Sequence, residues 1–143
     1  MQIRIPKAVF FDIDDVCDKR SLLPHMLPSK RTFENKMSEL GIKSSDNVII
    51  YCREGVMSSP RAWWMFLYFG HKKVFILNGG LKAWKLANGK ITQGPINIMQ
   101  TKYKTGRVKK RLNLKIQRMF ILKYIRQREK KRKKQERKQY KLF

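Results

Sequence analysis

The sequence has few cysteines and lacks any long hydrophobic run. Its two cysteines are Cys17 and Cys52, whereas a small secreted domain held together by disulfides usually contains more. No apolar stretch approaches the ~20 residues that span a bilayer. Aspartates interrupt the short apolar run near the N-terminus, so the apolar core of a signal peptide is missing. These features predict a water-soluble protein of the cytoplasm.

Histidine is equally scarce, which bears on metal binding. The two histidines, His25 and His71, have no companion ligands at the spacing that zinc and similar ions require. We therefore expect no metal site.

Acidic residues are scarce mainly in the second part of the chain. The 143 residues include 34 Lys and Arg against 10 Asp and Glu, a formal net charge of +24. Residues 1–100 carry an excess of +7 and residues 101–143 an excess of +17. This shift predicts a globular domain in residues 1–100, followed by a basic tail, helical or disordered, in residues 101–143.

Two interpretations of the basic tail remain open. Loosely spaced apolar residues and the lysine-rich run at 130–134 fit a basic amphipathic helix that binds nucleic acid or an anionic membrane. No aromatic platform or recognisable nucleic-acid fold accompanies the run, which disfavours this interpretation. The alternative is a non-native extension, for instance from a shifted reading frame. We expect residues 126–143 to be mobile.

Short apolar runs and helical patterns alternate along the first hundred residues. The runs at 8–11, 47–51 and 74–77 fit buried strands. Between them, a helix after Ser29 ends at Gly41, a helix capped by Ser59 ends at Gly70, and a short helix covers 81–87. Alternating strands and helices predict an α/β fold with a parallel sheet and right-handed crossovers.

Cys52 stands where such a sheet places its ligands, directly after the central strand. The loop that follows leads into a helix, so its backbone N–H groups and the helix dipole can stabilise a thiolate. Arg53 adds a positive charge, Glu54 opposes it, and Gly55 permits a tight backbone path. The pattern predicts a nucleophilic Cys52 whose substrate is bound by the loop residues Arg53, Glu54, Gly55, Val56, Met57 and Ser58.

Three interpretations of Cys52 compete. A cysteinyl-phosphate mechanism normally needs arginine six positions later to hold the phosphate, but Ser58 stands there. Sulfur transfer through a persulfide meets no such objection. The third interpretation is a buried cysteine that acts only as a small apolar residue.

Several motifs resemble the N-terminal half of two-domain rhodaneses and 3-mercaptopyruvate sulfurtransferases. They are PKAVFFDID at 6–14, LPHMLPS at 23–29, SSPRAWWMF at 58–66, FGH at 69–71 and LNGGLKAW at 77–84. The resemblance covers residues 5 to about 95 and implies the rhodanese fold, a twisted parallel sheet flanked by helices. It also implies transfer of sulfane sulfur to cyanide or a thiol, without a metal or organic cofactor.

The departures from this family pattern point in two directions. In the two-domain enzymes of this family, the N-terminal half usually has aspartate where this chain has Cys52, and that half is then catalytically silent. The run CREGV at 52–56 resembles the active loop of the catalytic halves instead, although Glu54 and Met57 differ from common residues there. The family's first strand lies before the Ile-Pro segment and is expected to be absent here, which leaves an open sheet edge.

This resemblance, with its departures, leaves two possible functions. The first is sulfur transfer from thiosulfate or mercaptopyruvate through a Cys52 persulfide, with Arg61 as a further substrate-binding residue or as the partner of an aspartate in residues 12–15. The second is a silent domain that serves as a structural or regulatory partner. A complementary rhodanese domain is the partner expected in that case.

Overall fold

The computed structural model describes residues 3–53 and 58–108. These residues belong to a first compact unit, Met1–Val108, and a second unit comprises Lys109–Phe143. The predictions for residues 109–143, including the amphipathic helix, its nucleic-acid or membrane partner and its mobility, lie outside the described residues. Within the described ranges, no helix has both the length and the apolar character needed to cross a membrane.

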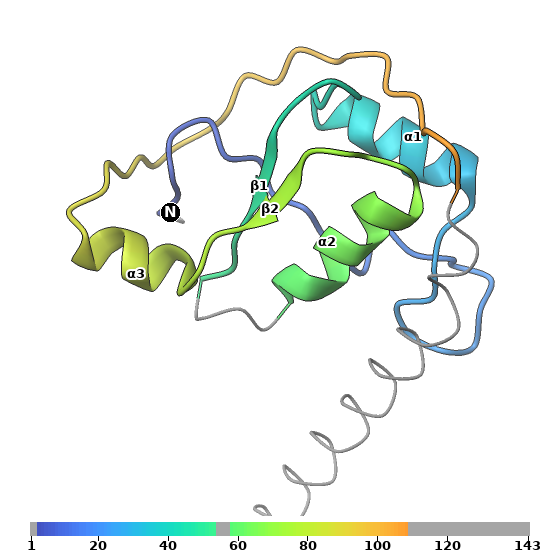
Figure 1. Ribbon diagram of the computed structural model, residues 1–143, viewed down its shortest axis with the longest axis horizontal. Coiled ribbons are helices and arrows are strands. Elements are labelled where there is room, and N and C mark those ends of the chain that lie inside the picture. The colour runs from blue at the N-terminus through green and yellow to red at the C-terminus, as the bar shows by residue number, and fades with distance from the viewer. Residues whose placement is uncertain (1–2, 54–57, 109–143) are drawn as a thin grey trace, which may run out of the picture. The chain divides into compact units, whose positions relative to one another are not determined.

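A small parallel sheet forms the centre of the fold. Strand β1 (Val48–Ile50) pairs in parallel with β2 (Val74–Ile76), with Val48 opposite Val74. Helix α2 (Ser59–Tyr68) connects the two strands and packs on them (Figure 1). Helix α1 (Lys30–Glu39) precedes β1, and α3 (Gly80–Leu86) follows β2. The predicted α/β class with a parallel sheet and flanking helices is confirmed.

The predicted strand at residues 8–11 is wrong. The described sheet has two strands, and the 8–11 segment makes no backbone hydrogen bond to β1. A turn precedes it, in which Ala8 N–H donates to the Ile5 carbonyl at 3.1 Å and Lys7 adopts a positive φ of 64°. The predicted burial does not hold throughout either, because Phe10 is 73% exposed. An apolar run forms a strand only where a neighbouring strand lies within about 5 Å to complete its ladder.

Local signals set the ends of the helices. The Ser29 hydroxyl accepts a hydrogen bond from Thr32 N–H at 3.1 Å, as predicted for the cap of α1. Gly41 then takes a φ of 71°, which glycine adopts at little cost. The predicted cap of α2 is wrong by one residue, because Ser58 is the N-cap and Ser59 is already helical and 2% exposed.

The core lies where α1 and α2 meet. Phe33 of α1 is fully buried, and its ring stacks on that of Phe69 with centroids 4.2 Å apart. Phe66 and Tyr103 meet the Phe33 ring edge-on at 5.3 and 5.8 Å. This aromatic cluster, Phe33, Phe66, Phe69 and Tyr103, fixes α1 against α2 and so supports the sheet from one side.

The compact unit extends to Val108, beyond the domain boundary predicted at residue 100. Tyr103 is only 3% exposed, and its hydroxyl lies 2.9 Å from Nδ1 of the buried His71. Gly106 N–H donates to the carbonyl of Phe69, and the segment runs alongside α1 (Figure 1). The composition becomes basic before the compact unit ends, so the shift in charge predicts an end of the globular domain that lies before Val108.

Glu34 of α1 holds this last segment through its carboxylate. Its Oε1 accepts hydrogen bonds from both the N–H and the hydroxyl of Thr105, each at 2.8 Å. Burial by itself would raise the pKa of the Glu34 carboxyl, but these two bonds and nearby lysines outweigh burial and lower it. The ionised carboxylate therefore stabilises the folded state.

We expect the free energy of unfolding to fall as acid protonates Glu34. A carboxyl whose folded pKa is depressed stabilises the fold above its unfolded pKa of about 4.3, and this contribution is lost as the pH falls through the folded value. Glu34→Gln keeps an acceptor of the same shape, so it should lower the free energy of unfolding at pH 7 by about 1 kcal/mol or less. It should also make the fall of this free energy between pH 7 and pH 3 less steep than in the wild type. Urea titrations between pH 7 and pH 3 measure both effects.

Glu39→Gln is the matched control, because Glu39 lies on the same helix with its side chain 53% exposed. It should change stability at pH 7 by no more than about 0.5 kcal/mol. If the free energy of unfolding fell equally steeply with pH in the wild type and in Glu34→Gln, the role assigned to the Glu34 carboxylate would be contradicted.

Candidate functional site

Cys52 lies at the carboxyl end of β1, one loop before α2. Its carbonyl accepts a hydrogen bond from Leu81 N–H at 3.0 Å, which ties the first turn of α3 to the end of the central strand. Neither Cys52 nor Cys17 forms a disulfide, and both are half-buried. The thiol is therefore held at the meeting point of β1, α2 and α3 by backbone contacts.

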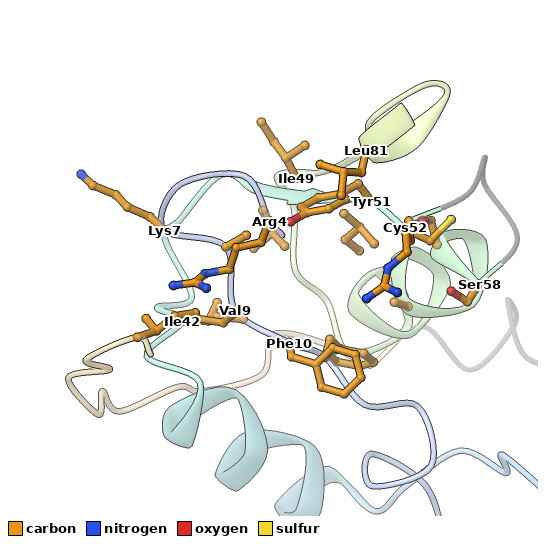
Figure 2. A pocket seen from close by; sticks show the side chains of 18 of the residues that line it. Arg4, Lys7, Val9, Phe10, Ile42, Ile49, Tyr51, Cys52, Ser58 and Leu81 are labelled. Atoms are coloured by element: carbon orange, nitrogen blue, oxygen red, sulfur yellow. The ribbon is translucent and has the colours of Figure 1, made fainter. Parts of the chain in front are cut away.

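Cys52 lines a cavity of about 610 Å³ between the N-terminal segment and β1 (Figure 2). Arg53, Ser58 and Ser59 contribute to the same wall, so the structure brings the two ends of the predicted loop together. Glu54, Gly55, Val56 and Met57 lie outside the described residues, and their predicted roles stay predictions.

Arg61 lies outside this cavity. Its guanidinium donates a hydrogen bond to the carbonyl of His25 and lies 4.8 Å from the centre of the Trp64 ring. Burial lowers the pKa of this guanidinium, and nearby Cys17 partly offsets that effect. Its predicted role in substrate binding stays a prediction.

The ion pair expected between Arg61 and an aspartate of residues 12–15 is wrong for the residues that the structure describes. His25 stands between them, with Nδ1 3.1 Å from Asp14 Oδ1 and its carbonyl bound to Arg61. Sequence spacing gave no sign of this arrangement, because it depends on how the irregular 21–28 segment folds.

Two cavity residues escaped the sequence analysis. Arg4 lines the cavity, and its backbone forms an isolated antiparallel bridge with that of Thr92. Its Nη1 donates a hydrogen bond to the Gly94 carbonyl at 2.6 Å. Tyr51 accepts a hydrogen bond from Ile5 N–H at 3.1 Å, which fixes the N-terminal segment to the end of β1. No local pattern identifies either residue, since their partners lie far away in sequence.

Comparison with known proteins identifies the fold family. A profile of the rhodanese-like domain matches residues 2–87, which is more than half of the chain. The chain belongs to the rhodanese-like domain family. Within it, the chain is related to the N-terminal part of 3-mercaptopyruvate sulfurtransferases.

Curated relatives of this rhodanese-like domain are sulfurtransferases. It is 48% identical over 81 residues to the mitochondrial thiosulfate/3-mercaptopyruvate sulfurtransferase 1 of Arabidopsis thaliana, covering 57% of this chain and 21% of the relative. The chain is 42% identical over 99 residues to the 3-mercaptopyruvate sulfurtransferase of Escherichia coli K12, and the match covers 69% of this chain and 35% of the relative. The chain thus spans only about a fifth to a third of these relatives.

Solved structures agree with this assignment. The crystal structure of a 3-mercaptopyruvate sulfotransferase from Escherichia coli aligns with a TM-score of 0.69 at 40% identity, over 73% of this chain and 40% of that chain. The crystal structure of the Tum1 protein of Saccharomyces cerevisiae aligns with a TM-score of 0.63 at 34% identity, over 76% of this chain and 35% of that chain. The rhodanese fold of the domain is established on this basis.

Proposed function

We propose that this rhodanese-like domain transfers sulfane sulfur through a persulfide on Cys52. One observation carries the proposal, namely that a half-buried thiol stands at the carboxyl end of β1 in the wall of a large cavity. Ligands of parallel α/β sheets bind at this edge. The relatives named above are sulfurtransferases, which makes sulfur transfer the chemistry to test first.

The first half-reaction loads sulfur onto Cys52. The Cys52 thiolate attacks the outer sulfur of thiosulfate, the sulfur–sulfur bond of the donor breaks, and sulfite leaves with the bonding electron pair. With mercaptopyruvate as donor, the carbon–sulfur bond breaks instead and the departing enolate takes up a proton to give pyruvate. Cys52 carries one additional sulfur atom in either case.

The second half-reaction returns the thiolate. Cyanide or an acceptor thiolate attacks the outer sulfur of the persulfide, and the Cys52 sulfur leaves as thiolate with the electron pair. Arg53 beside Cys52 and the N-terminal end of α2 supply positive potential for the anionic donor and for the persulfide anion. No redox cofactor enters this balance.

Mass spectrometry after incubation with thiosulfate tests the proposal. We expect the intact protein to gain the mass of one sulfur atom, and fragmentation should place this atom on Cys52 and not on Cys17. Addition of cyanide should remove it with formation of thiocyanate. A folded protein that gains no sulfur, or gains it on Cys17 alone, would overturn the proposal.

Strand β1 pairs with β2 along one edge, and within residues 3–53 and 58–108 no hydrogen bond reaches the backbone of Ile49. This open edge favours a second candidate function, that of a catalytically silent partner domain. Sheet edges with unpaired backbone groups commonly associate with another chain. This candidate predicts a folded protein that takes up no sulfur by itself but changes the activity of a sulfurtransferase chain added to it. A complementary rhodanese domain is the partner to add in that assay.

A further inference from the structure

His71 and Tyr103 form a buried polar pair that the proposed sulfur transfer does not use. His71 is 4% exposed and Tyr103 is 3% exposed. The Nδ1 atom of His71 lies 2.9 Å from the Tyr103 hydroxyl, and its Nε2 atom lies 3.0 Å from the Asp46 carbonyl. The two rings stack with their centroids 5.9 Å apart. Both nitrogens of the imidazole are therefore engaged inside the domain.

The partners of His71 specify its protonation state. The Asp46 carbonyl can only accept a hydrogen bond, so Nε2 carries a proton. Burial raises the pKa of the Tyr103 hydroxyl, and the Glu34 carboxylate adds to this effect, so the hydroxyl keeps its proton at neutral pH. The hydroxyl then donates to Nδ1, which satisfies both side chains when the imidazole is neutral.

A proton added to Nδ1 would break this arrangement. Nδ1 would become a donor, and the Tyr103 hydroxyl would have to turn its own proton away. Among residues 3–53 and 58–108, that hydroxyl has no other hydrogen-bond partner. A buried imidazolium and a buried hydroxyl proton without an acceptor both destabilise the folded arrangement.

The surrounding charges also oppose an imidazolium. Helix α2 presents the uncharged Phe66 ring to His71, edge-on at 5.3 Å. The carboxylates of Glu34 and Asp46 already accept hydrogen bonds, from Thr105 and from Lys43 N–H. The chain next to His71, Asp46 and Tyr103 carries five exposed lysines, which are Lys43, Lys72, Lys73, Lys102 and Lys104. Positive groups thus outnumber negative ones around the pair.

The pair fastens the segment of residues 101–107, which runs alongside α1 (Figure 1). The Tyr103 N–H donates to Ser38 Oγ at 2.9 Å, and the Gly106 N–H donates to the Phe69 carbonyl at 3.0 Å. None of the groups in these two bonds titrates near neutral pH. His71 is therefore the contact of this segment that a small fall in pH can remove.

We propose that His71 and Tyr103 form an acid-sensitive latch, which releases residues 101–107 from α1 when His71 takes up a proton. The Tyr103 ring meets the buried Phe33 ring edge-on at 5.8 Å, so release uncovers part of the aromatic cluster. The latch is a device of the fold and goes beyond the proposed sulfur transfer.

Proton linkage sets the size of the effect. A histidine in water has a pKa of about 6.5, and the docked segment opposes the added proton. Docking is therefore complete above about pH 6.5 and weakens as the pH falls below it. At pH 5, about 1.5 units lower, the docking equilibrium constant falls by at most about 30-fold.

Hydrogen exchange of the full chain at pH 7 and pH 5 tests the latch. After correction for the intrinsic exchange rates, the amides of Tyr103, Lys104, Thr105 and Gly106 should exchange up to about 30-fold faster at pH 5. They should exchange faster than the amides of α2 at both pH values, because the latch opens without unfolding the domain. Exchange independent of pH, or always equal to that of α2, would overturn the latch.

His71→Gln keeps a donor for the Asp46 carbonyl and an acceptor for the Tyr103 hydroxyl, but it does not titrate in this range. Its exchange at residues 103–106 should change by less than about threefold between pH 7 and pH 5. His25→Gln is the matched control, because the His25 side chain is 35% exposed, and this variant should keep the response of the wild type. A full response in His71→Gln would assign the effect to another group and reject the latch.

Nitrogen-15 spectra of the wild-type histidines test the latch without any substitution. At pH 7 the His71 imidazole should be neutral with its proton on Nε2. A proton on Nδ1 at pH 7 would overturn the inference. Neither test involves a sulfur donor, so the latch and the proposed function can fail independently.

Discussion

Cys52→Ser should lower the rate of thiosulfate-to-cyanide sulfur transfer by at least about 10³-fold. The serine hydroxyl is close to the thiol in shape but stays protonated near neutral pH, and it is a far weaker nucleophile toward sulfur. The contact that holds residue 52 uses its backbone carbonyl and Leu81 N–H, so the fold should persist. Thiocyanate production by purified wild type and variant measures the effect.

Cys17→Ser is the matched control for this experiment. Cys17 is also half-buried, but its Sγ donates a hydrogen bond to the Asp14 carbonyl at 2.9 Å, and it does not line the Cys52 cavity. A serine hydroxyl can replace this bond, so sulfur transfer should stay within about threefold of wild type. If Cys17→Ser lost activity and Cys52→Ser kept it, the nucleophile would be Cys17.

Phe33→Ala should lower the free energy of unfolding by about 3–5 kcal/mol. The Phe33 ring is fully buried, stacks on Phe69 and meets Phe66 and Tyr103 edge-on. Its removal leaves a cavity between α1 and α2, because three aromatic partners cannot all move into the space. Natural domains have a stability of roughly 5–15 kcal/mol, so this loss removes a substantial part of the total. Urea denaturation followed by circular dichroism measures the loss.

Phe75→Ala provides the matched control for Phe33→Ala. Phe75 is the same residue type but is 55% exposed on β2. The same truncation at this position should cost about 1 kcal/mol or less, since most of the ring is already in water. Equal losses for the two variants would contradict the placement of the core between α1 and α2.

The alternation of elements and the ends of α1 could be predicted from the sequence, because the responsible interactions are local. Ser29 caps α1 through a residue three positions away, and Gly41 ends it by its own backbone freedom. The position of Cys52 after β1 followed from the β-branched run before it. The motifs shared with rhodanese-like domains then identified the fold over most of the described residues.

Tertiary structure alone decided the features that depend on distant partners. Residues 8–11 make no backbone hydrogen bond to β1, although their apolar pattern predicts a strand. The Arg61 guanidinium donates to the His25 carbonyl, a partner 36 positions away in sequence. Glu34 recruits Thr105 across a long sequence separation, which carries the compact unit past residue 100. Hydrogen-bond partners of this kind are selected by packing, so neither composition nor periodicity specifies them.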